Sequence, residues 1–387
     1  MKLQVAGRLS GTEEYYFSRK LREIEQMNQS GERVINLGIG SPDLPPAKVV
    51  TDTLSEEAAK ADTHGYQSYK GIPALREAMA AWYGRYYGVS LDPNKEVLPL
   101  MGSKEGIVHV CMTYLEEGDE ALIPNPGYPT YASAVRLSGA TAVPYRMDEA
   151  GDWLPDLEVL AGLVTERTKL MWLNYPHMPT GTRAPESFFE ELVAFARERG
   201  ILLCHDNPYS FILNDQPRSL LSVPGALDVA IELNSLSKSA NMAGWRIGML
   251  MGHADRISEI LRFKSNMDSG MFLPAQKAAV RALELGPEWY AEMNREYQER
   301  KKLATALLDL LGCQYRADQS GLFVWARIPA DRHSGYELID EVLNEARVFL
   351  APGGIFGDAG NAYVRISLCA NQDTFGEALE RVRAMKS

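Results

Sequence analysis

The sequence predicts an α/β fold, with a large, doubly wound and mostly parallel sheet and a smaller α+β domain after it. Between about residues 96 and 252, short apolar runs alternate with segments of helical pattern. Several of the runs, such as KLMWLNY and VAIELNS, are apolar on both faces, which is typical of parallel strands buried between two layers of helices. Polar motifs follow several of these runs, and ligands of open α/β sheets bind at the carboxyl ends of the strands.

The chain is expected to divide into three parts, because 387 residues exceed the size at which one core stops growing. Residues 1–45, with a helix at 12–30 and the irregular GIGSPDLPPA, predict an arm that belongs to the small domain. Residues 46–285 are expected to form the large domain. Residues 286–387 predict the small C-terminal domain, with a long amphipathic helix at 287–312 followed by the strands GLFVWARI, VFLAPG and AYVRISLC.

Composition excludes several classes of function. A net charge of −11 argues against binding to nucleic acid or to a membrane surface, since both need a basic patch. The first residues lack the apolar stretch of a signal peptide, so we expect a cytoplasmic protein. The cysteines lie far apart without a CxxC pair, which predicts neither a metal site nor a disulfide framework; they are Cys111, Cys204, Cys313 and Cys369.

The segment SLSKSANMAGWRIG (235–248) predicts an activated lysine. Ser235 lies three residues before Lys238, and Arg246 lies eight residues after it. A free lysine, with a pKa of about 10.4, is a poor nucleophile at neutral pH, but desolvation and cationic neighbours lower that pKa. A hydroxyl and a guanidinium close by can hold a phosphate group. The residues alone therefore indicate an α/β enzyme with an anion site and a candidate activated lysine.

Three further motifs follow predicted strands. GSKEG (102–106) opens a helix, where backbone N–H groups bind phosphate, and Ser103 adds a hydroxyl. Asp206 in HDNPYS ends a strand, where it either meets a ligand or caps the next helix. Tyr128 in NPGYPTY either stacks on a heteroaromatic ring or packs on the surface. Gly38-Ile39-Gly40 is not a nucleotide-binding loop, because prolines rather than a helix follow it.

Residues 37–369 resemble the fold-type I aminotransferases of class I and II, which depend on pyridoxal 5′-phosphate (PLP). The pattern S-x-S-K followed by G-x-R-x-G is complete here, at Ser235, Ser237, Lys238, Gly244, Arg246 and Gly248. The resemblance implies a PLP-dependent aminotransferase with Lys238 as the Schiff-base lysine. Such an enzyme moves an amino group between an L-amino acid and a 2-oxo acid by a ping-pong mechanism, as part of amino-acid biosynthesis.

The resemblance also implies the roles of individual residues. Asp206 would keep the pyridine nitrogen protonated, and Tyr209 would donate to the phenolic oxygen, so that both join Lys238 as catalytic residues. Arg365 would clamp the substrate α-carboxylate, which the backbone at Gly40 approaches. The other cofactor-binding positions are Ser103, Lys104, Tyr128 (stacked on the ring), Ser235, Ser237 and Arg246.

Tyr66, in YQSYKGIPALREAM (66–79), matches a tyrosine that reaches the phosphate in the neighbouring subunit. The resemblance therefore implies a homodimer with shared active sites.

One position departs from the family pattern. The loop NYPHMPTG (174–181) has Met178 where the family has an asparagine that donates to the PLP phenolate. A thioether cannot donate a hydrogen bond. Three interpretations remain open: His177 turns inward and substitutes, a water takes the place of the amide, or the enzyme has shifted its substrate or slowed. We expect partial compensation.

The subgroup that the sequence resembles most is the LL-diaminopimelate aminotransferase-like set, through stretches such as LMGSKEGI, CHDNPYS and KSNMDSG. In that subgroup Tyr15, Lys104 and Asn266 match substrate-contacting positions, although Tyr15 equally suits packing of the arm and Asn266 a helix cap. Leu261 occupies the place of the arginine that aspartate-specific relatives use, which disfavours aspartate as the substrate.

Other functions stay open at this point. The side-chain pocket also suits methionine, aromatic residues or alanine, and the same lysine would serve a PLP-dependent C–S β-lyase or a decarboxylase. A regulator with an aminotransferase-like domain would need a DNA-binding extension, for which the arm is too short. An inert structural protein leaves the grouping of these motifs without a reason.

Overall fold

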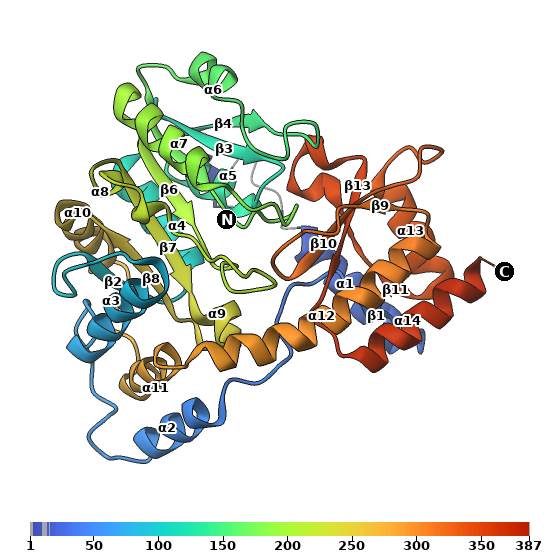
Figure 1. Cartoon of the computed structure of the whole chain (residues 1–387), viewed down its shortest axis with the longest axis horizontal. Helices are drawn as coiled ribbons and strands as arrows, with labels where there is room; N and C mark the ends of the chain where they lie inside the picture. The colour runs from blue at the N-terminus through green and yellow to red at the C-terminus, as the bar shows by residue number, and fades with distance from the viewer. Residues whose placement is uncertain (1–2, 10–13, 15, 387) are drawn as a thin grey trace.

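A seven-stranded sheet organises the larger part of the chain in the computed structural model, which describes residues 3–9, 14 and 16–386 (Figure 1). Six of its strands run in one direction, and only β8 runs against its neighbours β2 and β7. The predicted mostly parallel α/β sheet is therefore confirmed. In spatial order the strands are β2 (Val97–Leu100), β8 (Gly248–Gly252), β7 (Ala230–Ser235), β6 (Leu202–Asp206), β5 (Thr168–Leu173), β3 (Glu120–Asn125) and β4 (Thr141–Arg146).

Side chains on the two faces of this sheet enter two different cores. Along β5, Leu170 and Trp172 pack in a cluster with helices α4, α5 and α10, whereas Met171 and Leu173 pack on the opposite face with α3 and α7. This alternation follows from the two-residue period of a strand, and it explains why the runs are apolar throughout. These helices are α3 (Pro73–Tyr87), α4 (Ser103–Tyr114), α5 (Pro129–Leu137), α7 (Glu186–Arg199) and α10 (Ala254–Lys264).

Shorter elements complete this part of the chain. Helices α2 (Lys48–Ala58) and α11 (Leu273–Leu283) pack against each other, and α11 also packs on α3. The remaining α-helices here are α6 (Leu157–Leu163), α8 (Ala226–Val229) and α9 (Leu236–Ser239). None of the helices that the structure describes is long and apolar enough to cross a membrane.

The long helix α12 (Pro287–Leu310) runs from the large sheet to a second, smaller α+β unit (Figure 1). This unit has a four-stranded antiparallel sheet in the order β12 (Ala351–Pro352), β13 (Tyr363–Ser367), β10 (Phe323–Arg327) and β9 (Gln314–Tyr315). Helices α13 (Gly335–Ala346) and α14 (Gln372–Met385) accompany it. The stretch VFLAPG, expected as one strand, forms two short ones, because β11 (Val348–Phe349) pairs with β1 while β12 pairs with β13.

The N-terminal segment joins the C-terminal unit. Its helix α1 covers Tyr16–Gln29, and β1 (Ile35–Asn36) pairs in parallel with β11. The buried Arg300 of α12 binds Asp43, with Nη2 at 3.0 Å from Oδ2. These contacts agree with an arm that belongs to the small unit, while the boundaries at residues 45 and 285 stay a prediction.

Candidate active site

A cavity of about 480 Å³ lies at the carboxyl edge of the large sheet. Because six strands run in one direction, the polar residues that follow them meet at this edge. Most of the residues predicted from the sequence line the cavity: Gly40, Ser103, Lys104, Tyr128, Met178, Asp206, Tyr209, Ser235, Ser237, Lys238, Arg246 and Arg365.

Lys238 occupies the short helix α9 directly after β7. Its Nζ donates a hydrogen bond of 2.7 Å to the carbonyl oxygen of Gly40. Burial lowers the pKa of the Lys238 ammonium, and the nearby Arg365 and Arg246 lower it further. A lysine in this setting is more often neutral than a solvated one, which is what a nucleophilic amine needs.

One end of the cavity is built for an anion. Ser103 is the first residue of α4, and both Ser103 and Lys104 of its first turn line the cavity. The first turn of an α-helix is a common place for anions to bind. Gly102 before it has a φ of +89°, and a Cβ there would lie 2.0 Å from Nη2 of Arg246. Only glycine therefore lets the guanidinium lie against this loop. The Ser235 and Ser237 hydroxyls, 2.8 Å apart, add two more polar groups.

Asp206, the last residue of β6, is buried, and only one of its two carboxylate oxygens is hydrogen-bonded among the described residues. Oδ2 accepts a hydrogen bond of 2.9 Å from the hydroxyl of Tyr131. Oδ1 has no hydrogen-bond partner among the residues that the structure describes. Burial raises the pKa of Asp206 to about 6, against the opposing effect of the Tyr131 hydrogen bond. An unpaired buried acceptor is costly, so this oxygen fits a ligand that brings an N–H group.

Tyr131 was not predicted from the sequence. Its ring stacks on Trp172 with centroids 5.2 Å apart and meets the edge of Tyr128 at 5.6 Å. It therefore contacts both Tyr128 and Asp206. The motif NPGYPTY could have indicated this residue. Its second tyrosine follows the first by three residues, a spacing that places both side chains on the same face at the start of α5.

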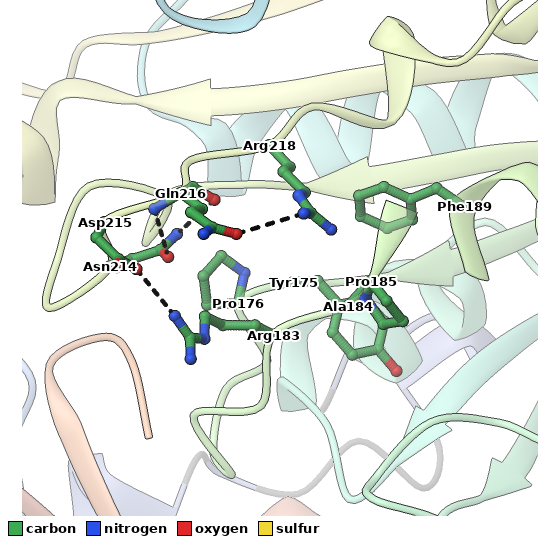
Figure 2. A pocket seen from close by; sticks show the side chains of 10 residues that line it. All are labelled: Tyr175, Pro176, Arg183, Ala184, Pro185, Phe189, Asn214, Asp215, Gln216 and Arg218. Carbon is green, nitrogen blue, oxygen red and sulfur yellow. Dashed lines mark hydrogen bonds and ion pairs between the residues drawn. The ribbon is translucent and has the colours of Figure 1, made fainter. Parts of the chain in front are cut away.

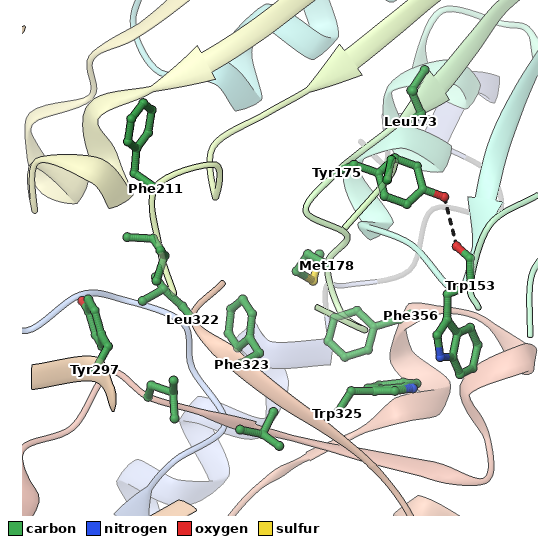
Figure 3. Packing of buried hydrophobic residues seen from close by; sticks show 14 of the residues in the cluster. Trp153, Leu173, Tyr175, Met178, Phe211, Tyr297, Leu322, Phe323, Trp325 and Phe356 are labelled. Atoms are coloured by element: carbon green, nitrogen blue, oxygen red, sulfur yellow. Dashed lines mark hydrogen bonds between the residues drawn. The ribbon is translucent and has the colours of Figure 1, made fainter. Parts of the chain in front are cut away.

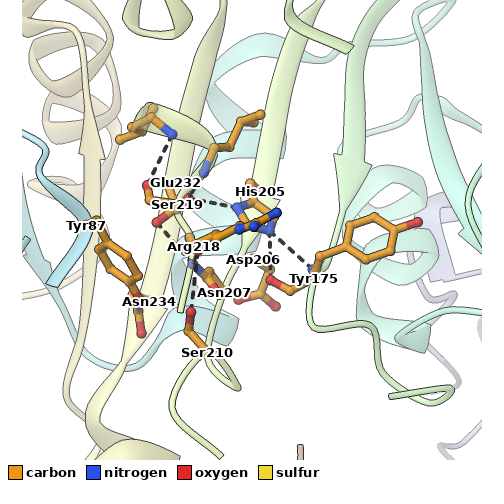
Figure 4. A network of polar contacts seen from close by, with 12 residues as sticks. Tyr87, Tyr175, His205, Asp206, Asn207, Ser210, Arg218, Ser219, Glu232 and Asn234 are labelled. Carbon is orange, nitrogen blue, oxygen red and sulfur yellow. Dashed lines mark hydrogen bonds and ion pairs between the residues drawn. The ribbon is translucent and has the colours of Figure 1, made fainter. Parts of the chain in front are cut away.

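A fully buried polar network supports β6 and β7 beneath Asp206 (Figure 4). His205 Nδ1 lies 2.7 Å from Glu232 Oε2, and its Nε2 accepts from the backbone N–H of Tyr175 at 3.2 Å. Glu232 also accepts hydrogen bonds from the Tyr83 hydroxyl and from the N–H of Leu220. The network links β6 to β7 next to Asp206 and so limits the movement of that carboxyl group.

Arg365 on β13 contacts two aromatic rings and the thioether of Met178. Figure 3 shows this methionine and both rings, those of Phe323 and Phe356, in one buried cluster. Its Nη2 donates to the Gly38 carbonyl at 2.8 Å, and Nη1 lies 3.3 Å from the sulfur of Met178. Its guanidinium carbon is 3.8 Å from the ring centroid of Phe323 and 4.5 Å from that of Phe356. These cation–π contacts hold the guanidinium in place.

The position of His177 bears on the interpretation that this histidine substitutes for the family asparagine. His177 does not line the cavity, and its Nδ1 lies 2.8 Å from the Thr180 hydroxyl. Burial lowers the pKa of His177 to about 3. In this chain His177 is therefore not among the residues placed to contact a ligand in the cavity. Asn174, which the sequence analysis passed over, accepts from the Met178 N–H at 2.8 Å and holds that residue at the cavity wall.

Two predicted residues that the structure describes do not line the cavity of this chain. Tyr66 is 94% exposed. Asn266 follows α10, where its Nδ2 donates to the Arg262 carbonyl at 2.8 Å, as a helix cap would. Tyr15 lies outside the described residues. A second hollow of about 310 Å³ near the Arg183–Asp215 ion pair (Figure 2) contains none of the predicted site residues.

The arrangement suits a flat heteroaromatic group with an anionic substituent, a ring nitrogen and a carbonyl carbon. The anionic substituent would lie at the end of the cavity with Ser103 and Arg246, and the ring nitrogen would face Asp206 Oδ1. The carbonyl carbon would lie next to Lys238, with the Tyr128 ring beside the heteroaromatic group. Such a group fits the residues that are present, since each of its polar features finds an opposite partner.

Comparison with known proteins gives the same picture along the whole chain. A family model described as "Aminotransferase class I and II" matches residues 32–382. LL-diaminopimelate aminotransferase from Moorella thermoacetica is 41% identical over 383 residues, 98% of each chain. The enzyme of the same name from Oleidesulfovibrio alaskensis is 39% identical over 384 residues, 98% of this chain and 99% of that one. The structure of apo-BacF from Bacillus subtilis has a TM-score of 0.95 at 36% identity, covering 100% of this chain and 99% of that one.

We predict that Asp206→Asn stabilises the cofactor-free protein at alkaline pH but not near pH 4. Below the ordinary carboxyl pKa of 3.8, Asp206 is protonated in the folded and the unfolded chain. As pH rises through about 6, the folded chain must ionise a buried carboxyl, and stability is lost. The shift corresponds to roughly 3 kcal/mol, since one pKa unit is about 1.36 kcal/mol.

Denaturant unfolding of both proteins at pH 4.5 and pH 8 measures this difference. Glu117→Gln, at an exposed position, is the control and should not alter the pH dependence. A gap between the Asp206→Asn protein and its parent that does not widen with pH would contradict the prediction.

Proposed function

The chain belongs to the class I and II aminotransferases, which depend on PLP, and we propose that Lys238 is the residue that carries the cofactor. One observation carries this proposal. A largely buried lysine, with its pKa lowered, lies between an anion end at Ser103 and Arg246 and the open oxygen of Asp206. Lys104, the other lysine among the described residues that line the cavity, is exposed to solvent.

The remaining cofactor contacts follow from the same cavity. Ser103, Ser235 and Arg246 would hold the phosphate, with Lys104 and Ser237 beside them. Asp206 Oδ1 would accept from the pyridine N–H, and Tyr128 and Tyr209 would contact the ring face and the phenolic oxygen. When bound, PLP supplies an electron sink for the charge that develops on the substrate Cα.

The protein's own residues then divide the work. Arg365 would bind the substrate α-carboxylate through two parallel hydrogen bonds, and its aromatic neighbours keep the fork in place. Lys238 Nζ, once the incoming amine has taken its place, would accept the proton from the substrate Cα. It would then donate that proton to the cofactor. Its lowered pKa makes the neutral base available, and the Gly40 carbonyl orients it.

The identity of the amino donor is part of the proposal. The relatives are named for LL-diaminopimelate, which makes this compound one candidate donor, alongside methionine, aromatic amino acids, alanine and aspartate. A C–S β-lyase would use the same lysine. The two reactions separate in a half-reaction screen, in which each amino acid is mixed with the PLP-loaded enzyme and loss of the visible cofactor band is followed. Formation of a 2-oxo acid and later of glutamate from 2-oxoglutarate identifies an aminotransferase, whereas pyruvate and ammonia without an acceptor identify a lyase.

Lys238→Ala should abolish covalent retention of PLP and lower turnover by about 1,000-fold or more, since general bases contribute roughly 10²–10⁴-fold and the anchoring amine is lost as well. Borohydride reduction followed by mass spectrometry reports whether the cofactor is attached to the chain. Lys302→Ala, at an exposed lysine of α12, is the control and should retain both properties. Covalent retention and turnover in the Lys238→Ala protein would refute the assignment.

Met178→Asn should lower the pKa at which the cofactor linked to Lys238 changes its visible spectrum. The new amide would donate to the ionised phenolic oxygen, and a hydrogen bond to a charged acceptor contributes about 1.5–3 kcal/mol, or roughly 1–2 pKa units. Met178→Leu, which has a similar volume and no donor, should leave the spectroscopic pKa unchanged. If the Met178→Asn protein and the parent show the same spectroscopic pKa, the predicted hydrogen bond to the phenolic oxygen is excluded.

We also propose a homodimer in which Tyr66 reaches the phosphate in the neighbouring subunit. The full exposure of this tyrosine in one chain suits such a role. Tyr66→Phe should weaken PLP binding about 10- to 100-fold, as expected for the loss of one hydrogen bond to a charged group. Tyr69→Phe, at a neighbouring exposed tyrosine, is the matched control. A monomer in analytical ultracentrifugation, or unchanged PLP affinity in the Tyr66→Phe protein, would contradict this arrangement.

A further inference from the structure

We propose that Glu105, His109 and Asp268 form a binding site for a divalent transition-metal ion such as zinc. The three side chains belong to α4 and to the segment that follows α10. None of the three lines the cavity of the candidate active site, although Lys104, next to Glu105 in the chain, does. The proposed function uses none of them, so this is a second site and its test does not depend on the amino donor.

Two packed elements bring the three side chains together. Glu105 and His109 are four residues apart on α4, which places both on one face of that helix. Helix α10 packs on α4, and Asp268 lies four residues beyond Lys264, the last residue of α10. The backbone N–H of Asp268 donates to the Lys264 carbonyl at 3.1 Å, and its Oδ1 lies 2.8 Å from the Lys264 ammonium. These two contacts hold the Asp268 carboxylate beside α4.

Two of the three side chains are buried with polar atoms that have no partner. His109 is 1% exposed, and neither of its ring nitrogens has a hydrogen-bond partner among the described residues. The same holds for Oδ2 of Asp268, whose side chain is 4% exposed. Unpaired buried polar atoms are costly and rare in native folds. Since Asp268 Oδ2 and His109 Nε2 lie only 3.9 Å apart, a single bound ion would satisfy both atoms.

The separations are close to those of ligands around one ion. Glu105 Oε1 lies 3.4 Å from His109 Nε2, and Asp268 Oδ2 lies 3.9 Å from it, but neither oxygen is hydrogen-bonded to the ring. Zinc binds nitrogen and oxygen at about 2.0–2.2 Å, so two of its tetrahedral ligands are about 3.4 Å apart. In such a site the ion lies on the axis of the nitrogen lone pair and the oxygens lie off that axis. Oxygens in this position are poor acceptors for the ring N–H, which is the arrangement found here.

The charges and the types of ligand favour a transition metal. Two carboxylates face the single ammonium of Lys264, so the group carries a net negative charge when His109 is neutral. Lys264 binds Oδ1 of Asp268 and leaves Oδ2 for the ion, and ligating carboxylates are commonly supported in this way by a hydrogen bond. An imidazole nitrogen favours zinc and its neighbours over magnesium and calcium, which prefer oxygen ligands.

Two features make the site a reversible one. Three protein ligands leave a coordination position for water, and the Glu105 side chain, which is 30% exposed, gives the ion a path from solvent. In addition, Nδ1 of His109 has no partner among the described residues. The loss of such a supporting hydrogen bond lowers metal affinity about 10- to 100-fold. We therefore expect zinc to bind with a dissociation constant in the micromolar range.

Calorimetric titration of the chelator-treated, PLP-loaded protein with zinc tests the site. We expect one zinc ion to bind per chain, and magnesium in excess should not displace it. His109→Gln removes the ligand nitrogen and should weaken zinc binding about 10-fold or more. His333→Gln, at an exposed histidine, is the matched control and should bind zinc as the parent does. No zinc binding by the parent, displacement by magnesium, or equal binding by the His109→Gln protein overturns the proposal.

A second variant keeps the test decisive if the buried His109→Gln change prevents folding. Glu105→Gln alters a partly exposed side chain without changing its size, and it should also weaken zinc binding about 10-fold or more. Zinc should raise the melting temperature of the parent, because it binds the folded chain, and should raise that of the Glu105→Gln protein less at the same concentration. Glu117→Gln, at an exposed glutamate, is the control and should respond to zinc like the parent. An equal zinc affinity and an equal rise in melting temperature in the Glu105→Gln protein and the parent overturn the proposal.

Discussion

The backbone of residues 38–40 joins the two units of the molecule, and the candidate site depends on this junction. Lys238 from the large sheet donates to the Gly40 carbonyl, while Arg365 from the small sheet donates to the Gly38 carbonyl. Glycine is required at both places, because a Cβ on Gly38 would meet Phe349 at 2.5 Å and one on Gly40 would meet Phe323 at 2.3 Å. The close approach of this segment sets the separation between the candidate amine-exchange group and the candidate carboxylate clamp.

Electrostatics inside the cavity follow from burial more than from direct ion pairs. Burial lowers the pKa of Lys238 and raises that of Asp206, so the lysine is less charged and the carboxyl less ionised than either would be in water. Both groups are destabilising in the absence of a ligand, as is common where a fold prepares charges for chemistry. Tyr131 and the His205–Glu232 network stabilise the end of β6, where that cost falls.

Much of the architecture was predictable, because it depends on local patterns. The apolar runs predicted the strands of the large sheet. The motifs after them, together with the family resemblance, predicted twelve residues that line the cavity. The prediction of VFLAPG as a single strand was wrong, because its two halves pair with different strands, β1 and β13. Tyr131 and Asn174 were missed because their roles consist of hydrogen bonds to residues far away in the sequence.

The sequence by itself determined the class of fold, the family and the set of polar residues at the strand ends. These depend on period, spacing and residue type, which are local properties of the chain. Tertiary structure alone decided that His177 does not line the cavity, that Met178 contacts Arg365, and that Phe17 and Leu21 of α1 line the same cavity as the strand-end residues. Each of these depends on which distant side chains pack together around the junction at residues 38–40, and spacing along the chain carries no information about that packing.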